Sequence, residues 1–118
     1  MTNGVSWLLC LSVHAGRGSE FRTLMEEMVE FTRGEQGTQC YEWFLSSDDR
    51  SCHLYERYRD SAACLVHMAG FGARFADRFL SCVAPASLSV YGEPSAELRA
   101  ALDPFGAVYL APFGGFRR

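Results

Sequence analysis

The chain has 118 residues, a formal net charge of −3 at pH 7, and charged side chains at 21% of its positions. All 11 basic residues are arginine, which excludes Schiff-base lysines, lysine-anchored pyridoxal cofactors and Walker A lysines. With 48% hydrophobic and 14% aromatic residues, a chain of this length is expected to fold as one domain that buries roughly two-thirds of its unfolded surface.

The first predicted elements are a strand and a helix. Residues 6–14 are apolar on both alternating faces, which is typical of a buried strand. A turn at residues 16–18 follows, and Ser19 is the expected N-cap of a helix. From Phe21 onward, apolar residues recur at helical spacing with glutamates on the opposite face, and Gly34 is expected to end this helix.

The middle of the chain predicts a β-hairpin followed by a second helix. Residues 38–45 and 51–58 are rich in aromatic side chains, and the Ser- and Asp-rich residues 46–50 between them are typical of a hairpin connection. Asp60 is the expected N-cap of the helix, which the apolar spacing extends to about residue 69.

The second helical region is predicted to be interrupted at Gly70 and Gly72. Three phenylalanines then recur every four residues in a stretch that ends before Pro85, namely Phe71, Phe75 and Phe79. Their spacing is typical of a core face, and Phe75 is also a candidate wall of a ligand pocket. Residues 86–91 predict a fourth strand.

The order of these elements, β-α-β-β-α-β, predicts a ferredoxin-like plait. This is an α+β fold with two helices on one face of a four-stranded antiparallel sheet. Residues 1–91 are expected to form the domain. Residues 92–118 are expected to form a C-terminal arm that packs on the domain or on a dimer partner, with a short helix at residues 95–102.

Large apolar side chains occupy both faces of the predicted hairpin. Trp43 and Phe44 point to opposite faces of the sheet. On the next strand, Leu54 and Tyr55 do the same. Because two helices cover only one face, the other face would expose an apolar patch that a monomer seldom tolerates. We therefore expect a homodimer in which a second copy packs sheet to sheet.

The composition also bears on location and on partners. The five cysteines are odd in number, widely spaced and without a C-x-x-C pair, which favours reduced, mostly buried thiols in the cytoplasm. The first residues lack the basic stretch of a secretory signal, and no segment approaches the roughly 20 apolar residues of a membrane helix. Because the arginines form no basic stripe, neither nucleic acid nor a membrane is an expected partner.

Four stretches of the chain carry a family resemblance. They are Gly16-x-x-x-Glu20-Phe21, Gly37-x-x-x-Tyr41-Glu42, Leu54-Tyr55-Glu56-Arg57-Tyr58-x-Asp60 and Ala62-Ala63-x-x-x-His67-Met68. Together with the order of elements, they make residues 5–91 resemble the antibiotic biosynthesis monooxygenase superfamily of dimeric α/β-barrel proteins. The resemblance implies a small homodimer with a pocket between sheet and helices in each subunit.

The best-understood members of that superfamily oxidise quinols, anthrones or similar aromatics with molecular oxygen and without flavin, metal or haem. The resemblance thus implies a cofactor-independent monooxygenase that acts on a small quinol-like or polyketide-like aromatic and needs no metal. The alternative is a non-catalytic dimeric barrel that binds a small hydrophobic or aromatic ligand. Haem binding or degradation is disfavoured, because residues 61–66 lack the tryptophan that precedes the helical histidine in the haem-degrading branch.

Two residues are candidates for catalysis. His67 matches the helical histidine of the family, and its position late in a helix would favour the imidazolium form. The alternative for His67 is a structural, packed histidine. Glu56 lies in mid-strand on the face of Leu54 and Tyr58, where it is either a general base or one half of a structural ion pair with an arginine.

Candidate ligand-binding residues lie on the same hairpin. Trp43 and Tyr55 could stack on a flat aromatic ligand, with tyrosine hydroxyls, Tyr41 included, as donors to a developing oxyanion. His53 shares the face of Tyr55 and is a further candidate. Since neighbours in a strand point to opposite faces, Tyr55 and Glu56 cannot line the same pocket. Core or interface packing explains these aromatic residues equally well.

Overall fold

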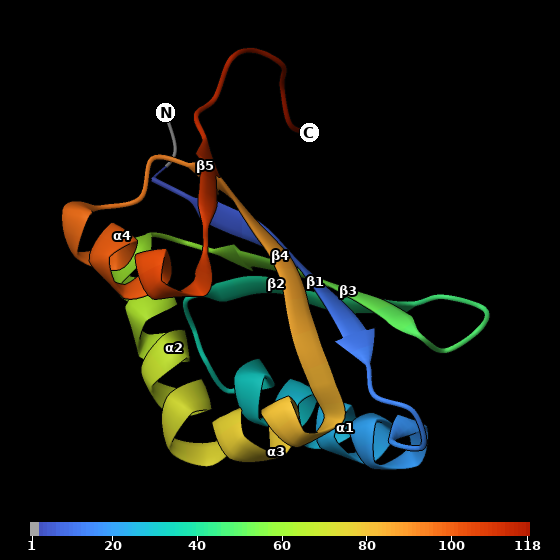
Figure 1. The fold of residues 1–118 in the computed structure, drawn as a ribbon. Coiled ribbons are helices and arrows are strands. Elements are labelled where there is room, and N and C mark those ends of the chain that lie inside the picture. The colour runs from blue at the N-terminus through green and yellow to red at the C-terminus, as the bar shows by residue number, and fades with distance from the viewer. Residues whose placement is uncertain (1–2) are drawn as a thin grey trace.

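A computed structural model describes residues 3–118 of the protein (Figure 1), and residues 1 and 2 of the predicted domain lie outside this range. The elements in chain order are β1 (Val5–Val13), α1 (Gly18–Arg33), β2 (Thr38–Leu45), β3 (Ser51–Tyr58), α2 (Ser61–Arg74), α3 (Ala76–Cys82), β4 (Val83–Gly92), α4 (Ala96–Leu102), the 3-10 turn η1 (Asp103–Phe105) and β5 (Val108–Leu110). The predicted ferredoxin-like α+β fold is confirmed, and both hairpin strands have the predicted bounds.

The sheet has five strands in the order β2-β3-β1-β4-β5. The first four pair antiparallel, as in the predicted plait. Strand β5 runs parallel to β4, so the C-terminal segment adds an edge strand to the four predicted ones. Helices α1, α2 and α3 lie together on one face of the sheet (Figure 1).

Two helix boundaries differ from the prediction. Helix α1 begins at Gly18 rather than after Ser19, and no side-chain hydrogen bond caps it. Helix α2 runs through Gly70 to Arg74 instead of stopping at the glycine. A Cβ atom at position 70 would lie 3.1 Å from the Phe31 ring, so this glycine allows close packing of α2 and does not terminate it.

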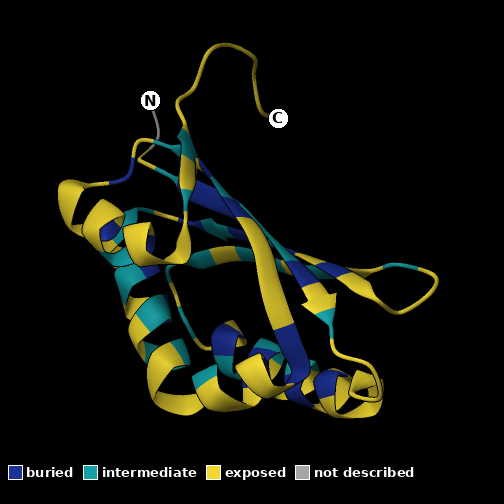
Figure 2. Cartoon of the chain, viewed as in Figure 1, coloured by how far each residue is buried: buried dark blue, intermediate teal, exposed yellow. Residues whose placement is uncertain are grey.

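Buried residues of the strands and helices are marked in Figure 2. They form a hydrophobic core between the helices and the sheet, which divides into two clusters. One cluster joins the sheet to α1 and α3, and the other joins it to α2 and α4. Leu98 and Leu102 of α4 belong to the second cluster and are almost fully buried. Each such leucine contributes about 1.5–3 kcal/mol on burial. Helix α4, predicted as part of the arm, is therefore packed on the domain.

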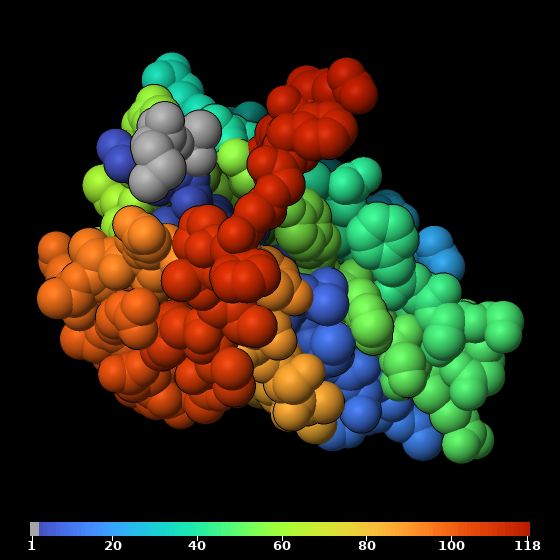
Figure 3. All heavy atoms as spheres, turned by 90° about the horizontal axis from the view of Figure 1, so that it is seen from above, coloured from blue at the N-terminus to red at the C-terminus, as the bar shows by residue number. Residues whose placement is uncertain are grey.

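The opposite face of the sheet is not covered by helices α1 to α3 and is open in a single chain (Figure 3). Large apolar side chains exposed on its strands are Phe44, Tyr91, Val108 and Leu110. Beyond β5, residues 111–118 extend away from the body of the molecule, with Phe113 and Phe116 exposed (Figure 1). The open face and this arm together hold six of the ten large apolar side chains that are exposed on the described residues.

None of the helices in residues 3–118 combines the length and the apolar character that a bilayer crossing requires. All five cysteines carry free thiols, and three of them are buried. Burial raises the pKa of the Cys52 thiol to about 11 and that of the Cys64 thiol to about 12. Both thiols are therefore protonated at neutral pH and are poor nucleophiles.

Candidate acid–base site

Strand register brings Glu56 to the middle of the helix-covered face. Within the sheet, Glu56 pairs with Tyr41 of β2 on one side and with Trp7 of β1 on the other. Side chains paired in this way share one face of the sheet, and Glu56 is only 3% exposed. The carboxylate is therefore held between two aromatic residues beneath the helices.

The His67 imidazole completes a buried cluster around this carboxylate. Its Nε2 atom lies 3.2 Å from Oε1 of Glu56, and its Nδ1 atom lies 2.8 Å from Oε1 of Glu35. The Tyr58 hydroxyl donates a hydrogen bond to the same Glu56 oxygen, and the Thr38 hydroxyl donates to Glu35 at 2.8 Å. We call Glu35, Glu56, Tyr58 and His67 the acid–base cluster.

Two local features bring His67 into this position. Asp60 accepts a hydrogen bond from the Ala63 backbone N–H, as predicted for the N-cap of α2, and so fixes where the helix begins. Ala63 packs so closely on Gly37 that a Cβ atom at position 37 would lie 2.5 Å from the Ala63 Cβ. Because His67 is one turn further along the same helix face, the loop that carries Glu35 meets it.

The charges in the cluster determine its protonation. Burial alone would lower the pKa of His67, but the hydrogen bonds and charges of Glu56 and Glu35 outweigh burial and raise the pKa above its ordinary value. The imidazolium then donates from both ring nitrogens. Burial, together with the Glu56 charge, raises the pKa of Tyr58, which keeps the phenol protonated. With both carboxylates ionised, the cluster carries one net negative charge.

Two further polar groups lie beside the cluster without hydrogen-bond partners. They are the Tyr41 hydroxyl and the Trp43 indole N–H, which are buried and unpaired among residues 3–118. Tyr41 packs edge-on against Trp43 and against the His67 ring, with centroids 5.7 and 5.4 Å apart. Burial, together with the Glu56 charge, raises the pKa of Tyr41, so its phenol stays protonated and can donate. Unpaired buried donors are rare, so this is a place where a ligand oxygen or a water would complete the bonding.

A pocket of about 700 Å³ opens between α1 and the sheet, on the side of Trp43 away from the cluster. Its walls include Val13, Phe21, Arg22, Met25, Trp43 and Cys52. Trp43 lies two residues along β2 from Tyr41, which pairs with Glu56. Trp43 in the wall of this α1 pocket is thus about 7 Å along β2 from Tyr41, the residue that is paired with Glu56. His67 does not line the pocket.

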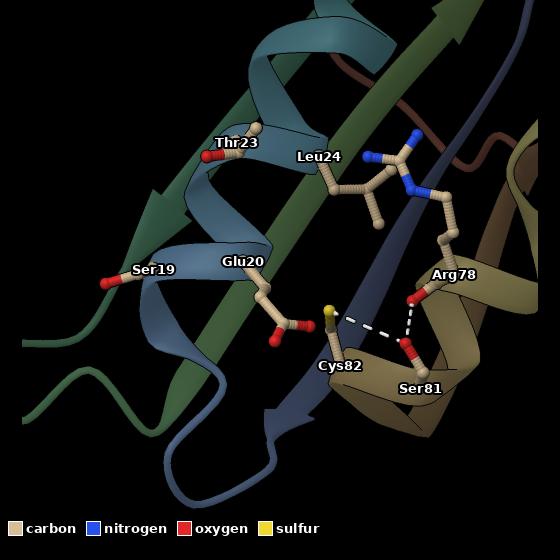
Figure 4. A pocket seen from close by; sticks show the side chains of 7 residues that line it. All are labelled: Ser19, Glu20, Thr23, Leu24, Arg78, Ser81 and Cys82. Carbon is tan, nitrogen blue, oxygen red and sulfur yellow. Dashed lines mark hydrogen bonds between the residues drawn. The ribbon is translucent and has the colours of Figure 1, made fainter.

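A second pocket, of about 310 Å³, lies between α1 and α3 (Figure 4). The Arg78 guanidinium in it donates two hydrogen bonds to Glu27, at 3.1 and 2.7 Å. The Ser81 hydroxyl donates to the Arg78 carbonyl. These polar groups are already paired, and none of the predicted site residues lines this pocket. The α1 pocket is therefore the better candidate for a ligand.

The other predicted ligand-binding residues do not join this site. His53 and Tyr55 alternate with Glu56 along β3, so they point to the open face of the sheet, away from the cluster and the pocket. Phe75 is buried in the core, where its ring lies 5.7 Å from that of Phe31, and it lines neither pocket. Of the predicted residues, the structure brings His67 and Glu56 into contact, and Tyr41 packs between His67 and Trp43.

Sequence reasoning misses two members of the cluster. Tyr58 is two residues from Glu56 and shares its face, a signal that could have identified the pair. Glu35 lies in a loop 32 residues before His67, and no spacing rule connects the two. The sequence suggested an arginine as the structural partner of Glu56. The structure instead pairs its carboxylate with a histidine, His67, and a tyrosine, Tyr58.

Comparisons with known proteins agree with the fold. The family model described as antibiotic biosynthesis monooxygenase matches residues 9–70, more than half of the chain and a range that includes the whole acid–base cluster. Among solved structures, MupZ from Pseudomonas fluorescens is similar over 100% of this chain and 91% of its own, with a TM-score of 0.90 and 18% identity.

Two other solved structures are similar over about four-fifths of the chain. SnoaB from Streptomyces nogalater, a cofactor-independent oxygenase, has a TM-score of 0.67 and 18% identity over 80% of this chain and 96% of its own. Rv0793 from Mycobacterium tuberculosis has a TM-score of 0.61 and 23% identity over 78% and 96%, respectively. At these identities the similarity concerns the fold alone. No match was found among curated proteins.

Proposed function

The chain belongs to the antibiotic biosynthesis monooxygenase family, and from this premise we propose that it is a cofactor-independent monooxygenase. In this proposal it oxidises a small quinol-like or polyketide-like aromatic with molecular oxygen. The observation that carries the proposal is the buried acid–base cluster beside two unpaired donors. SnoaB, which has a similar fold, is itself a cofactor-independent oxygenase.

In the proposed complex, a flat aromatic ligand occupies the α1 pocket and packs against Trp43. The volume of about 700 Å³ and the apolar side chains of Val13, Phe21 and Met25 suit a small apolar molecule. Tyr41 and Glu56 are not in the pocket wall, so in this proposal the ligand reaches past Trp43 toward the cluster. One ligand oxygen then accepts hydrogen bonds from the Trp43 N–H and the Tyr41 hydroxyl. These two donors stabilise negative charge as it develops on that oxygen.

The acid–base cluster supplies the base for this reaction. Glu56 removes a phenolic or activated C–H proton, while Tyr58 and His67 hold its carboxylate through donated hydrogen bonds. The ligand anion passes one electron to oxygen, and the substrate radical and superoxide combine to a peroxide anion. This anion takes back the proton held by Glu56, and loss of water from the hydroperoxide leaves a carbonyl. The demands on the protein are therefore one base and donors for one oxyanion.

We further propose that the protein acts as a homodimer in the cytoplasm. The open face of the sheet leaves Phe44 56% exposed and Leu110 47% exposed, and monomers rarely keep such an apolar face in water. A second copy packed sheet to sheet would cover it under two-fold symmetry. Five free thiols are typical of a reducing compartment.

Oxygen consumption and product mass, measured with a panel of quinols and anthrones, test the proposed activity. The wild type is expected to consume one oxygen molecule for each product molecule. Glu56→Gln and His67→Ala are expected to slow turnover at least about tenfold, a barrier increase of about 1.4 kcal/mol. His14→Ala alters an exposed histidine at the end of β1 and serves as the control with unchanged turnover.

Other outcomes would contradict this function in different ways. Equal turnover without oxygen would exclude monooxygenation and leave proton transfer as the reaction. Tight binding of an aromatic compound with no turnover would support the non-catalytic ligand-binding barrel. A Soret shift on addition of haemin, again without turnover of the panel, would favour haem binding.

A further inference from the structure

Glu35 has no direct part in the proposed reaction, although it belongs to the acid–base cluster. It makes no contact with the Glu56 carboxylate, which it reaches only through Nδ1 and Nε2 of His67. Its side chain is 12% exposed. A carboxylate with so little exposure is costly unless it is paired. We therefore look for the role of Glu35 in its effect on His67.

The loop around Glu35 is fixed before any ligand arrives. Its backbone N–H donates to the Thr32 carbonyl at 2.9 Å, and its own carbonyl accepts from the Thr38 N–H at 3.3 Å. The Thr38 hydroxyl also holds Oε1 of the side chain. The close packing of Gly37 on α2 sets the distance to the helix. The carboxylate is thus aimed at His67 by the fold.

The negative charge of Glu35 determines the net charge of the cluster after Glu56 has accepted a proton. With Glu56 and His67 alone, carboxylate and imidazolium would cancel, and a proton taken up by Glu56 would leave a buried positive charge. With Glu35 present, the cluster begins with one net negative charge and becomes neutral when Glu56 takes the proton. The negative charge then lies on the ligand, beside the donors of Tyr41 and Trp43.

We propose that Glu35 is a positioning residue that holds His67 as a doubly hydrogen-bonded imidazolium, so that Glu56 acts as a base on a ligand that binds neutral. The inference rests on the proposed function and deepens it by naming the charge class of the substrate. That class is the neutral phenols, quinols and similar weak acids, since a carboxylate would bring a second negative charge to the cluster. Arg22 and Asp49 both line the α1 pocket, so its wall adds no net charge.

The proton transfer is balanced within these groups. The O–H or C–H bond of the ligand breaks, its electron pair stays on the ligand, and the proton bonds to the Glu56 carboxylate. Besides His67 and the two carboxylates, the titratable groups here are Tyr58, which belongs to the cluster, and Tyr41 of β2 and Cys64 of α2, which lie next to it. Burial raises the pKa of all three, so they remain protonated while His67 titrates against the two carboxylates.

Histidine NMR titration tests the positioning role without a substrate. His14 is exposed and lies away from the cluster, so it serves as the internal reference. Glu35→Gln is expected to lower the titration midpoint of His67 by about 1–3 pH units. Glu35→Asp keeps the charge with a shorter reach and is expected to lower it less. Glu26→Gln, the same charge change on the exposed side of α1, leaves the midpoint unchanged.

An unaltered His67 midpoint in Glu35→Gln would overturn the positioning role, whether or not the protein turns over a substrate. Where Glu35→Gln does not fold, Glu35→Asp decides, because any loss of the contact at 2.8 Å must lower the midpoint. An upward shift in either variant would equally overturn the proposal.

Ligand charge is tested with two bicyclic probes, neutral 1-naphthol and anionic 1-naphthoate, by quenching of tryptophan fluorescence. The wild type is expected to bind 1-naphthol about tenfold or more tightly than 1-naphthoate. Glu35→Gln reduces this preference, and Glu26→Gln does not. Equal binding of the two probes by the wild type, or tighter binding of 1-naphthoate, would overturn the neutral-ligand inference. Neither measurement needs oxygen, so a failure of the monooxygenase proposal would be seen separately.

Discussion

At the scale of one residue, the surroundings of Glu56 in β3 make its carboxylate a candidate base. Alternation along β3 places its side chain on the same face as that of Tyr58, two residues on, which is the face that the helices cover. The strand register pairs it with Tyr41 on one side and Trp7 on the other. A lone carboxylate in that place would cost several kcal/mol. The hydrogen bonds from Tyr58 and His67 offset this cost, which ties the three side chains into one unit.

Stability should depend on pH through His67. Its folded-state pKa is raised above the ordinary 6.5, so the stabilisation from its charged form is complete below that value and is lost as the pH rises through the folded pKa. The free energy of unfolding of the wild type should therefore exceed that of His67→Gln most at about pH 6 and progressively less at higher pH. Urea denaturation at a series of pH values measures this difference.

The matched control for this dependence is His14→Gln, which changes an exposed histidine. Its free energy of unfolding should follow that of the wild type at every pH. A His67→Gln difference that stays constant from about pH 6 to 9 would show that the imidazolium form contributes nothing to stability.

The sequence allows part of the candidate site to be predicted, and the limits are physical. Alternation along β3 separates Glu56 from Tyr55, and a helical position late in α2 singles out His67. The role of Glu35 is not predictable in this way, because it depends on how closely a loop can approach Gly37 and its helix neighbour Ala63. That approach is a property of tertiary packing and leaves no periodic signal in the sequence.

At the scale of whole elements, the ends of a helix or strand are predicted best where a local interaction determines them. The hairpin strands have their predicted bounds, since alternation and a polar connection define both ends. Asp60 caps α2 as predicted, whereas Ser19 caps nothing because α1 begins one residue earlier. Strand β5 escapes prediction, because a strand of three residues exists only through its pairing with β4 once α4 has docked.

These two capping predictions can be compared by substitution. Asp60→Ala removes the acceptor for the Ala63 N–H and is expected to lower the free energy of unfolding by about 1 kcal/mol. Ser19→Ala removes no capping bond and is expected to change it by less than about 0.5 kcal/mol. Chemical denaturation of both variants measures the difference. Equal losses would mean that the Asp60 bond does not stabilise α2.

At the scale of the whole molecule, the sheet has one face covered by helices and one face open. The covered face accommodates the acid–base cluster, and the open face holds His53 and Tyr55, which the sequence had suggested as ligand contacts. If the proposed homodimer forms, these residues lie at or near the contact between the two copies. The exposed apolar side chains on which the dimer prediction rests thus lie on the face opposite the cluster.

The dimer is tested by matched charge substitutions on the two sides of the molecule. Phe44 on the open face is 56% exposed and Leu80 on α3 is 54% exposed, so a monomer would tolerate aspartate equally at both positions. Wild type and Leu80→Asp are expected to sediment as dimers, and Phe44→Asp is expected to dissociate at least about tenfold more readily. A monomeric wild type, or equal dissociation of the two variants, would contradict the sheet-to-sheet contact.

The contact between Gly37 and Ala63 has a consequence for how such a site can change in evolution. No side chain fits at position 37 while α2 stays where it is, since the added Cβ would lie 2.5 Å from that of Ala63. A lineage that gains a side chain at position 37 must move the helix away, which would disturb the link between Glu35 and His67. A sequence pattern therefore follows from this contact: Gly37 and Ala63, which are 26 positions apart, together with Glu35 and His67. Distant sequences that share this chemistry can be searched for with this pattern.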